Sequence, residues 1–240
     1  SEIANVSRIC DLAIANKSGN DINGKSVKMA GFQTYLIDKF SKKLLDNGYT
    51  IPVINQDQQA PNSTRSLYCV LSPGTTFSTD SHIITNNTSC IWLSKISQFG
   101  REEIVIGISN VDIITGTTSI LEYKTEYLNS PSTFDELEKF ISVYNPSEVI
   151  IISNLEKDFI DNAISYTNIT AKCIHIIEIE NTSEELLKII HNCELQTYQN
   201  EIIEKFYIFS KKTHTIESFL HFPIACQSFC YLLDFIEKHN

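Results

Sequence analysis

The 240-residue chain lacks any long apolar run, and no segment approaches the ~20 consecutive apolar residues that span a bilayer. Its opening stretch, SEIANVSRICDLAIANK, carries acidic and basic groups where a signal peptide has an uninterrupted apolar core. We therefore expect a soluble, intracellular protein. Because the chain opens on Ser1 rather than methionine, we also expect a piece of a longer protein.

The sequence also lacks closely paired cysteines. Seven cysteines are present, an odd number, and no two are separated by the two residues that zinc and redox motifs use. We expect reduced, mostly buried thiols and no metal site. Cys226 and Cys230 can share one helix face, where packing is the expected role. The six histidines are scattered, and none pairs with a cysteine or serine in a way typical of nucleophilic catalysis.

Basic residues are fewer than acidic ones, so the formal net charge is -10. By itself this charge argues against binding to nucleic acid. The charge is uneven, however. Residues 1–75 hold eight basic and six acidic groups, a net of +2, so the remaining 165 residues carry -12. Only the first part of the chain can therefore approach phosphate easily.

The first 75 residues alternate helical and strand-like patterns. An apolar-periodic stretch runs from Ile3 to Leu12, and 13–15 alternates like a strand. The polar segment 16–26 predicts an exposed, mobile loop. Apolar residues at helical spacing from Gln33 predict a helix that stops at Asn47-Gly48. Segments 50–54 and 66–71 are strand-like, and a turn follows at 72–75.

Residues 76–90 are rich in Thr, Ser and Asn and are the best linker candidate. Beyond them, a run of strands precedes alternating helices and strands. Strands are expected at 90–93, 104–108, 111–114, 118–123, 149–152 and 173–179, and helices at 134–143, 159–166, 184–191 and after Pro223. Antiparallel strands leading into alternating strand and helix resemble an RNase-H-like α/β fold.

A match to the P-loop pattern spans Gly19 to Ser26, where Lys25 would neutralise phosphate. A P-loop needs a buried strand directly before its first glycine and a helix starting at the lysine. Here the polar residues 16–18 intervene, and Gly31 interrupts the segment that follows. No strand ending in an acidic magnesium partner follows either. A P-loop nucleotide-binding enzyme is therefore kept as an alternative function.

A set of short motifs, in order and at near-family spacing, resembles the mismatch-binding domain of the MutS family of DNA mismatch-repair proteins. The motifs are Met29-Ala30-Gly31, Tyr35-Leu36, Lys43-Leu44, Gly48-Tyr49, Val53-Ile54-Asn55-Gln56, Arg65 and Val70-Leu71-Ser72-Pro73-Gly74-Thr75. The segments Ile106 to Gly116 and Tyr144 to Ile150 resemble parts of the family's connector. No single motif is specific, but the ordered set is.

The chain departs from the family pattern at three places. Gln33-Thr34 replaces a frequent Pro-His, and Asn55-Gln56 replaces Glu-Gln. The family's Phe-x-Glu mismatch reader would lie before Ser1. These differences indicate a divergent member.

The resemblance implies an α/β protein of two domains. Residues 1–80 would be part of the mismatch-recognition domain, 81–87 a linker, 88–224 an RNase-H-like connector and 225–240 the start of a lever helix. The ATPase, with its ATP and magnesium, would lie outside this chain, which would then be no enzyme and hold no catalytic residue, cofactor or metal. Implied partners are double-stranded, mismatched DNA, a MutL-like protein on the connector, and a second copy in a parent homodimer. A DNA-associated protein with no membrane partner is expected.

The segment before Gly31 holds the candidate DNA-facing residues. We expect phosphate or sugar contacts from Asn16, Lys17, Ser18, Asn20, Lys25 and Lys28. Short polar and basic groups on a glycine-containing loop can follow a nucleic-acid backbone closely. Met29 is expected to make an apolar contact.

Other side chains suggest different chemistry. Asp112, Glu122 and Glu148 lie on or beside predicted strands, where two-metal nucleases place carboxylates, but the set is incomplete and solvated acids are favoured. Phe32 could unstack a base step, although core packing is favoured. A two-domain protein-interaction module without a nucleic-acid ligand remains the second alternative function.

Overall fold

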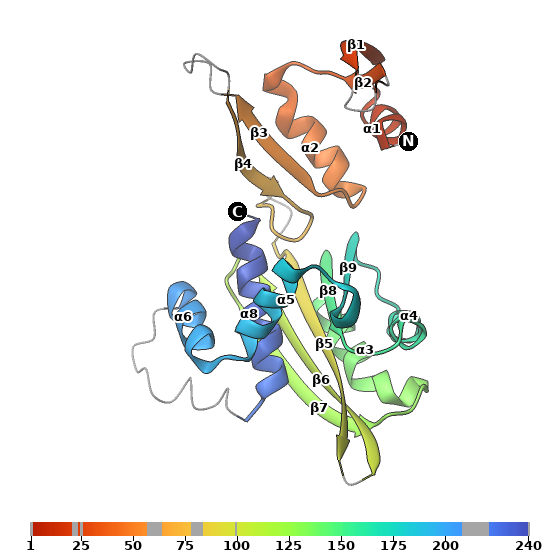
Figure 1. Cartoon of the computed structure of the whole chain (residues 1–240), viewed down its shortest axis with the longest axis vertical. Coiled ribbons are helices and arrows are strands. Elements are labelled where there is room, and N and C mark those ends of the chain that lie inside the picture. The colour runs from red at the N-terminus through yellow and green to blue at the C-terminus, as the bar shows by residue number, and fades with distance from the viewer. Residues whose placement is uncertain are drawn as a thin grey trace. The chain divides into compact units, whose positions relative to one another are not determined.

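The computed structural model describes residues 2–20, 24, 26–56, 64–77, 84–98, 100–207 and 221–239 (Figure 1). The chain divides into two compact units, Ser1–Pro73 and Gly74–Asn240, called unit 1 and unit 2 below. Each unit mixes helix and strand, so the expected α/β class is confirmed. Within the described ranges, no helix is both long and apolar enough to cross a membrane.

Unit 1 combines short helices with two antiparallel hairpins. Its elements are α1 (Glu2–Cys10), β1 (Ile14–Asn20), β2 (Ser26–Ala30), the 3-10 turn η1 (Thr34–Leu36), α2 (Ile37–Asp46), β3 (Ile51–Gln56) and β4 (Arg65–Leu71). Strand β1 pairs with β2, and β3 pairs with β4. Helix α2 buries Phe40 and Leu45, and the chain turns away from it as predicted, because Gly48 adopts a φ of 79° that favours glycine.

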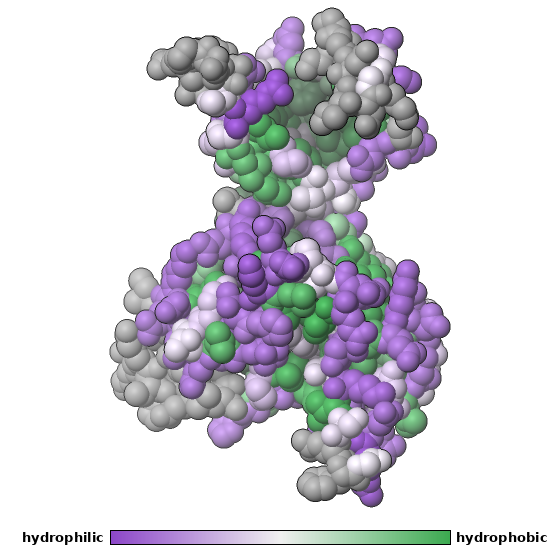
Figure 2. All heavy atoms as spheres, viewed as in Figure 1, coloured by the Kyte–Doolittle hydropathy of each residue, from purple (hydrophilic) through white to green (hydrophobic). Residues whose placement is uncertain are grey.

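Unit 1 leaves apolar side chains exposed. In the β3–β4 hairpin, Ile54 lies directly opposite Leu67, and the two are 59% and 62% exposed. Figure 2 shows hydrophobic residues reaching the surface of this unit beside hydrophilic ones. A two-stranded hairpin that packs on a helix covers only one face, so its other face stays open.

Unit 2 is built on a five-stranded sheet with the strand order β7-β6-β5-β8-β9. Its strands are β5 (Asn87–Gln98), β6 (Arg101–Asp112), β7 (Thr118–Glu126), β8 (Glu148–Ser153) and β9 (Cys173–Glu178). The first three form an antiparallel meander, whereas β8 runs parallel to β5 and β9 parallel to β8. The two strands predicted at 104–108 and 111–114 are instead the single strand β6 and the turn after it.

Helices cover both faces of this sheet (Figure 1). The helical segments are η2 (Pro131–Phe134), α3 (Asp135–Tyr144), α4 (Lys157–Tyr166), η3 (Ile179–Asn181), α5 (Glu184–Glu194), α6 (Gln196–Phe206) and α8 (Pro223–Lys238). On β5, Ile91 and Leu93 face the core formed with α3 and α4, whereas Cys90 and Trp92 face the core formed with α5, α6 and α8. Because both faces are covered, the central strands are apolar at consecutive positions.

Helix α8 packs on the sheet with its backbone in direct contact with β6. Gly107 permits this approach, since a Cβ there would lie 2.5 Å from the backbone nitrogen of Ala225. Farther along the helix, the Ser228 hydroxyl donates to the Cys90 carbonyl at 2.7 Å. Cys226 and Cys230 are both buried, which confirms their packing role. The segment expected to leave the connector as a lever is thus part of the core of unit 2.

The polar segment expected to form a linker is partly built into unit 2. Its residues 78–83 lie outside the described part of the chain. The linker prediction is wrong for residues 86–90, because their polar groups are paired inside the unit and β5 begins at Asn87. The Asn86 amide group donates to the Gly74 carbonyl at 3.3 Å, and the Ser89 hydroxyl donates to Asn110 at 2.8 Å. The predicted roles of the two units, a mismatch-recognition domain and a connector, remain predictions.

Candidate functional sites

The candidate DNA-facing residues lie on the β1–β2 hairpin. The prediction of a loop over 16–26 is wrong for 16–20, which form most of β1. In this hairpin Asn16 lies directly opposite Lys28, and Ala15 opposite Met29. Asn16 and Lys28 are exposed, and so is Met29. A directly opposite pair shares one face of a hairpin, so Asn16 and Lys28 present an amide and an ammonium group together.

The P-loop match spans this same hairpin. Gly19 ends up on β1 and Ser26 on β2, and Gly24 in the connection has a φ of 75°. Residues 26–30 are a strand, whereas a P-loop requires the start of a helix at this point to direct its amides at phosphate. Lys25 lies outside the described residues. The strand after Lys25 argues directly against the P-loop alternative.

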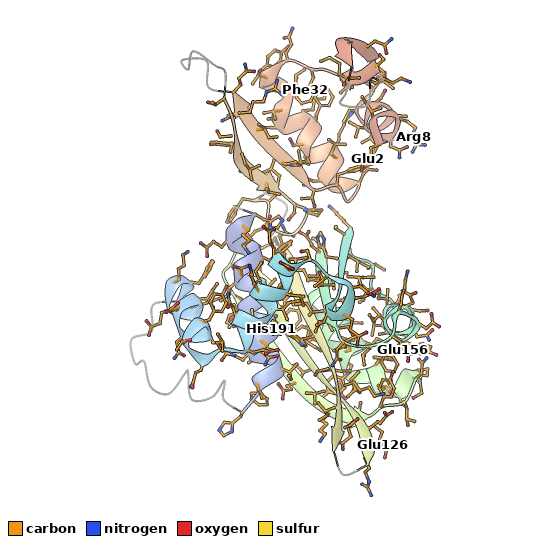
Figure 3. The ribbon with its side chains drawn as sticks, viewed as in Figure 1. Glu2, Arg8, Phe32, Glu126, Glu156 and His191 are labelled. Atoms are coloured by element: carbon orange, nitrogen blue, oxygen red, sulfur yellow. The ribbon has the colours of Figure 1, made fainter. Side chains whose placement is uncertain are left out.

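Phe32 packs on helix α2 without entering the core. Its ring centroid lies 4.7 Å from that of Phe40, and the side chain remains 44% exposed (Figure 3). The prediction that Phe32 packs in the core is therefore wrong about its burial, because the ring contacts Phe40 but stays partly exposed. The ammonium of Lys39 lies 5.8 Å from the centroid of the same Phe40 ring, close enough for a cation–π contact.

Asp112 organises the turn between β6 and β7. One carboxylate oxygen accepts hydrogen bonds from the amides of Asn86 at 2.9 Å and Ile114 at 3.1 Å, and the other accepts from the Thr115 hydroxyl at 2.6 Å. Burial raises the pKa of Asp112, but the hydrogen bonds together lower it by more than burial raises it. The pKa therefore lies below its ordinary value. Asp112 is buried, and the interpretation as a solvated acid is wrong for it.

Glu122 and Glu148 also hold backbone amides. Glu122 Oε2 accepts from the amides of Ile224 at 2.7 Å and Ala225 at 2.9 Å, at the N-terminus of α8, where a helix has unpaired N–H groups. Glu148 Oε2 accepts from the Gly74 amide at 2.8 Å. The side chain of Glu148 has no exposed surface, so the prediction of a solvated acid is wrong for it as well.

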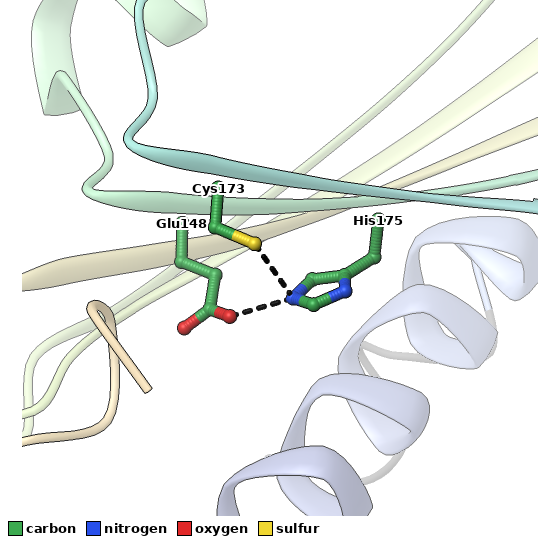
Figure 4. A group of neighbouring side chains, drawn as sticks. All are labelled: Glu148, Cys173 and His175. Atoms are coloured by element: carbon green, nitrogen blue, oxygen red, sulfur yellow. Dashed lines mark hydrogen bonds and ion pairs between the residues drawn. The ribbon is translucent and has the colours of Figure 1, made fainter. Parts of the chain in front are cut away.

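A mixed cluster forms around Glu148 at the start of the parallel strands (Figure 4). Its members are Glu148 on β8 and Cys173 and His175 on β9, and their potential ligand atoms all lie within 4.8 Å of one another. His175 Nε2 is 2.6 Å from Glu148 Oε1 and 3.4 Å from Cys173 Sγ. Within the described part of the chain, no other group of three or more His, Cys, Asp or Glu side chains brings its ligand atoms this close together.

The charge state of this cluster follows from its contacts. Hydrogen bonds from His175 to Cys173 and Glu148 raise the pKa of His175 to about 9, although burial lowers it. These contacts favour the protonated imidazole, which pairs with a carboxylate that is shielded from water. The His175 ring also lies 5.5 Å from that of Phe235 on α8, between centroids. The cluster can hold a proton or a cation between an oxygen, a nitrogen and a sulfur atom.

Comparisons with known proteins identify the relatives of the chain. Residues 3–80 match the family model of MutS domain I. A DNA mismatch repair mutS homolog of Acanthamoeba polyphaga mimivirus is 25% identical over 226 residues, 88% of this chain and 20% of that protein. The DNA mismatch repair protein MutS of Salinibacter ruber is 26% identical over 151 residues, 61% of this chain and 15% of that protein. The chain is thus similar to the MutS family, through its domain I in residues 3–80 and more distantly over most of its length.

The MutS likeness extends beyond domain I, because the mimivirus protein aligns with most of unit 2 as well. The chain spans about a fifth or less of the length of these relatives. Among solved structures, endonuclease V of Bacillus subtilis matches 28% of this chain and 32% of its own at 20% identity, with a TM-score of 0.20. A TM-score this low does not define the fold.

The MutS domain I match contains all the candidate DNA-facing residues, which the structure brings together only in part. Asn16 and Lys28 are opposite each other, and Met29 follows Lys28 on β2. Lys17, Ser18 and Asn20 belong to β1, and their side chains, like the whole of Lys25, lie outside the described residues.

The Glu148 cluster was missed by the sequence analysis. One local signal was present: a cysteine and a histidine two residues apart on a strand must project from the same face. The partner Glu148 could not be assigned without the strand register, in which it lies opposite Cys173.

Proposed function

We propose that the chain is the DNA-binding and connector part of a MutS-like mismatch-repair protein. Unit 1 contacts double-stranded DNA through the β1–β2 hairpin, and unit 2 is an RNase-H-like connector. The observation that carries this proposal is the exposed Asn16–Lys28 pair inside the segment that matches MutS domain I.

The hairpin suits contacts with the DNA backbone. An ammonium and an amide side by side can bind adjacent phosphate and sugar oxygens, which position a protein on DNA without reading its sequence. The side chains of the remaining candidates, Lys17, Ser18, Asn20 and Lys25, lie outside the described residues, and we propose that they add further phosphate or sugar contacts. Met29 is adjacent to Lys28 and 44% exposed, so it can make the proposed apolar contact. The net charge of +2 over residues 1–75 favours approach to phosphate.

The topology of unit 2 supports the RNase-H-like assignment. An antiparallel meander is followed by two parallel strands on one side, and helices cover both faces of the sheet. Residues 76–240 carry a net charge of -12, which disfavours phosphate and suits a protein partner. We propose that a MutL-like protein docks on this unit.

The relatives are much longer than this chain, so the rest of the proposal concerns the longer protein. We infer that ATP and magnesium bind in parts of the protein outside these residues, that the parent is a homodimer, and that this chain performs no catalysis. A protein of this kind is expected to act where DNA is, inside the cell.

Titration of fluorescent duplex DNA at several salt concentrations tests the DNA-binding surface. The variant Lys28→Ala should weaken binding and reduce the slope of log K against log salt by about 0.9, the effect of one lost phosphate contact. The control is Lys188→Ala, which removes an exposed lysine from α5 in unit 2 and should change neither value. Equal effects of both variants, or no salt-dependent binding at all, would favour the protein-interaction module instead.

A further inference from the structure

We propose that Glu148, Cys173 and His175 form a binding site for a divalent transition-metal ion such as zinc. The proposal concerns unit 2 alone and does not rest on DNA binding. It starts from three different ligand types whose donor atoms converge within 4.8 Å.

The sheet register creates this convergence. Strands β8 and β9 are parallel, and Glu148 is the partner of Cys173 while Ile150 is the partner of His175. Side chains alternate between faces with a period of two, so Glu148, Cys173 and His175 project from the same face at the edge of the sheet. Regular backbone hydrogen bonding thus fixes the positions from which all three side chains start.

The distances fit a metal ion better than a catalytic relay. Zinc bonds of about 2.0–2.3 Å in tetrahedral geometry separate neighbouring ligand atoms by roughly 3.3–3.5 Å. The Sγ–Nε2 distance is already 3.4 Å, and the Nε2–Oε1 distance of 2.6 Å has to open by roughly 0.7 Å. A Cys-His-Glu relay would place thiol and carboxylate on different ring nitrogens, whereas here both contact Nε2 of His175 (Figure 4).

The surroundings hold the ligands in place and leave a path for the ion. Glu148 is fully shielded, and its second oxygen accepts the Gly74 amide, so Oε1 is directed at His175. A hydrogen bond to the far side of a ligand is the usual way in which proteins orient metal ligands. The side chain of His175 is 31% exposed, which gives the ion access from solvent.

The donor set selects the class of metal. Magnesium and calcium require oxygen ligands, whereas a mixed oxygen, nitrogen and sulfur set suits zinc and its spectroscopic substitute cobalt. A carboxylate and a thiolate also neutralise a divalent charge in a site that is partly shielded from water. Three protein ligands leave one position for water or an external ligand. A bound ion would cross-link β8 to the edge strand β9.

Titration of the whole chain with Co²⁺ tests the site directly, because a thiolate bound to cobalt gives a charge-transfer absorption band. We expect one equivalent of Co²⁺ to produce this band. Added Zn²⁺ should replace the bound Co²⁺ and abolish the band, whereas added Mg²⁺ should leave the band unchanged. In Cys173→Ser the band should disappear. In Cys69→Ser, which alters a partly exposed free cysteine on β4, it should remain.

Calorimetry with Zn²⁺ gives the second measurement. His175→Ala should weaken zinc binding by more than the about 10- to 100-fold that loss of a supporting partner costs. The control His191→Ala, which alters an exposed histidine on α5, should leave the affinity unchanged. Absence of the charge-transfer band in the unaltered chain at saturating Co²⁺ overturns the proposal, whatever the stability of the variants. Persistence of the band in Cys173→Ser overturns it equally, because the thiolate must then come from elsewhere.

Discussion

The backbone amide of Gly74 donates a 2.8 Å hydrogen bond to the buried carboxylate of Glu148, which lies 74 residues farther along the chain. The Gly74 carbonyl accepts in turn from the Thr88 hydroxyl at 2.7 Å. Both polar groups of this peptide segment are therefore satisfied inside unit 2. An unpaired carboxylate at this depth would be strongly destabilising, so the first residue of unit 2 contributes directly to its stability.

Gly74→Ala should destabilise unit 2 by about 1 to 3 kcal/mol through overpacking. A Cβ at this position would lie 2.6 Å from Glu148 Cβ and 2.9 Å from Glu148 Oε2, and it would also collide with Thr88. Urea unfolding followed by circular dichroism measures the change. Gly31→Ala is the matched control, since a Cβ there meets no atom within 4 Å. Equal midpoints for the two variants would contradict this account.

Glu122→Gln should destabilise the docking of α8 by about 0.5 to 2 kcal/mol, the range for caps and for charges at helix termini. The substitution keeps an acceptor oxygen but removes the negative charge that faces the amides of Ile224 and Ala225. Denaturant titration again gives the change. Glu126→Gln, at the end of β7 (Figure 3), should stay within about 0.5 kcal/mol of the unaltered chain. A larger loss in the control would show that net charge, not the cap, is responsible.

The contribution of Asp112 should depend on pH. Its folded pKa lies below the unfolded value, so the stabilisation is present above the unfolded pKa of about 3.9 and is lost as pH falls through the folded pKa. The difference in unfolding free energy between the unaltered chain and Asp112→Asn should therefore narrow from pH 7 to pH 3. Asp161→Asn, exposed on α4, should cost within about 0.5 kcal/mol at pH 7. A difference that stays constant or widens on acidification would refute the hydrogen-bond account.

The chain should bind homoduplex and single-mismatch duplex with similar affinity. Residues 3–80, which match MutS domain I, contain no Phe-x-Glu triplet, and phosphate contacts alone carry little information about the bases. Competition between the two duplexes for the same labelled probe measures the ratio of affinities. A strong preference for the mismatch would show that other residues of unit 1 read the bases.

Isothermal calorimetry with ATP and magnesium should detect no saturable binding. The Gly19–Ser26 segment contributes to two strands of a hairpin, so it cannot offer the helix N-terminus that a P-loop uses. A micromolar affinity that disappears in Lys25→Ala would restore the nucleotide-binding alternative.

Elements with strong local signals were predicted well. Helix α2 combines apolar spacing with a glycine stop, and β8 is a short apolar run buried on both faces. By contrast, β1 continues beyond Ala15 into the polar run 16–20, in which no alternating apolar pattern marks a strand. No bounds were predicted for helix α6, because only Ile202 and Ile203 are buried along it, which is too few to produce a clear period.

The sites depended on information that the sequence does not carry locally. Asn16 and Lys28 were both chosen as polar groups near glycine, but their pairing follows from the hairpin register. Glu148 and Cys173 meet because two parallel strands align, and this register depends on the packing of the whole sheet. Burial of Glu148 could not be expected, since an acidic residue at the start of a strand is usually solvated.

The Thr75 hydroxyl donates a 3.2 Å hydrogen bond to the carbonyl of His239, 164 residues later. Unit 2 therefore starts and finishes at neighbouring points. Because its first and last residues are neighbours, a folded unit of this kind adds almost nothing to the distance between the ends of the polypeptide, whatever its size. A pull applied at Thr75 and His239 would load the hydrogen bond between these two residues directly. In mechanical terms, unit 2 is a closed body whose two ends are joined by a hydrogen bond.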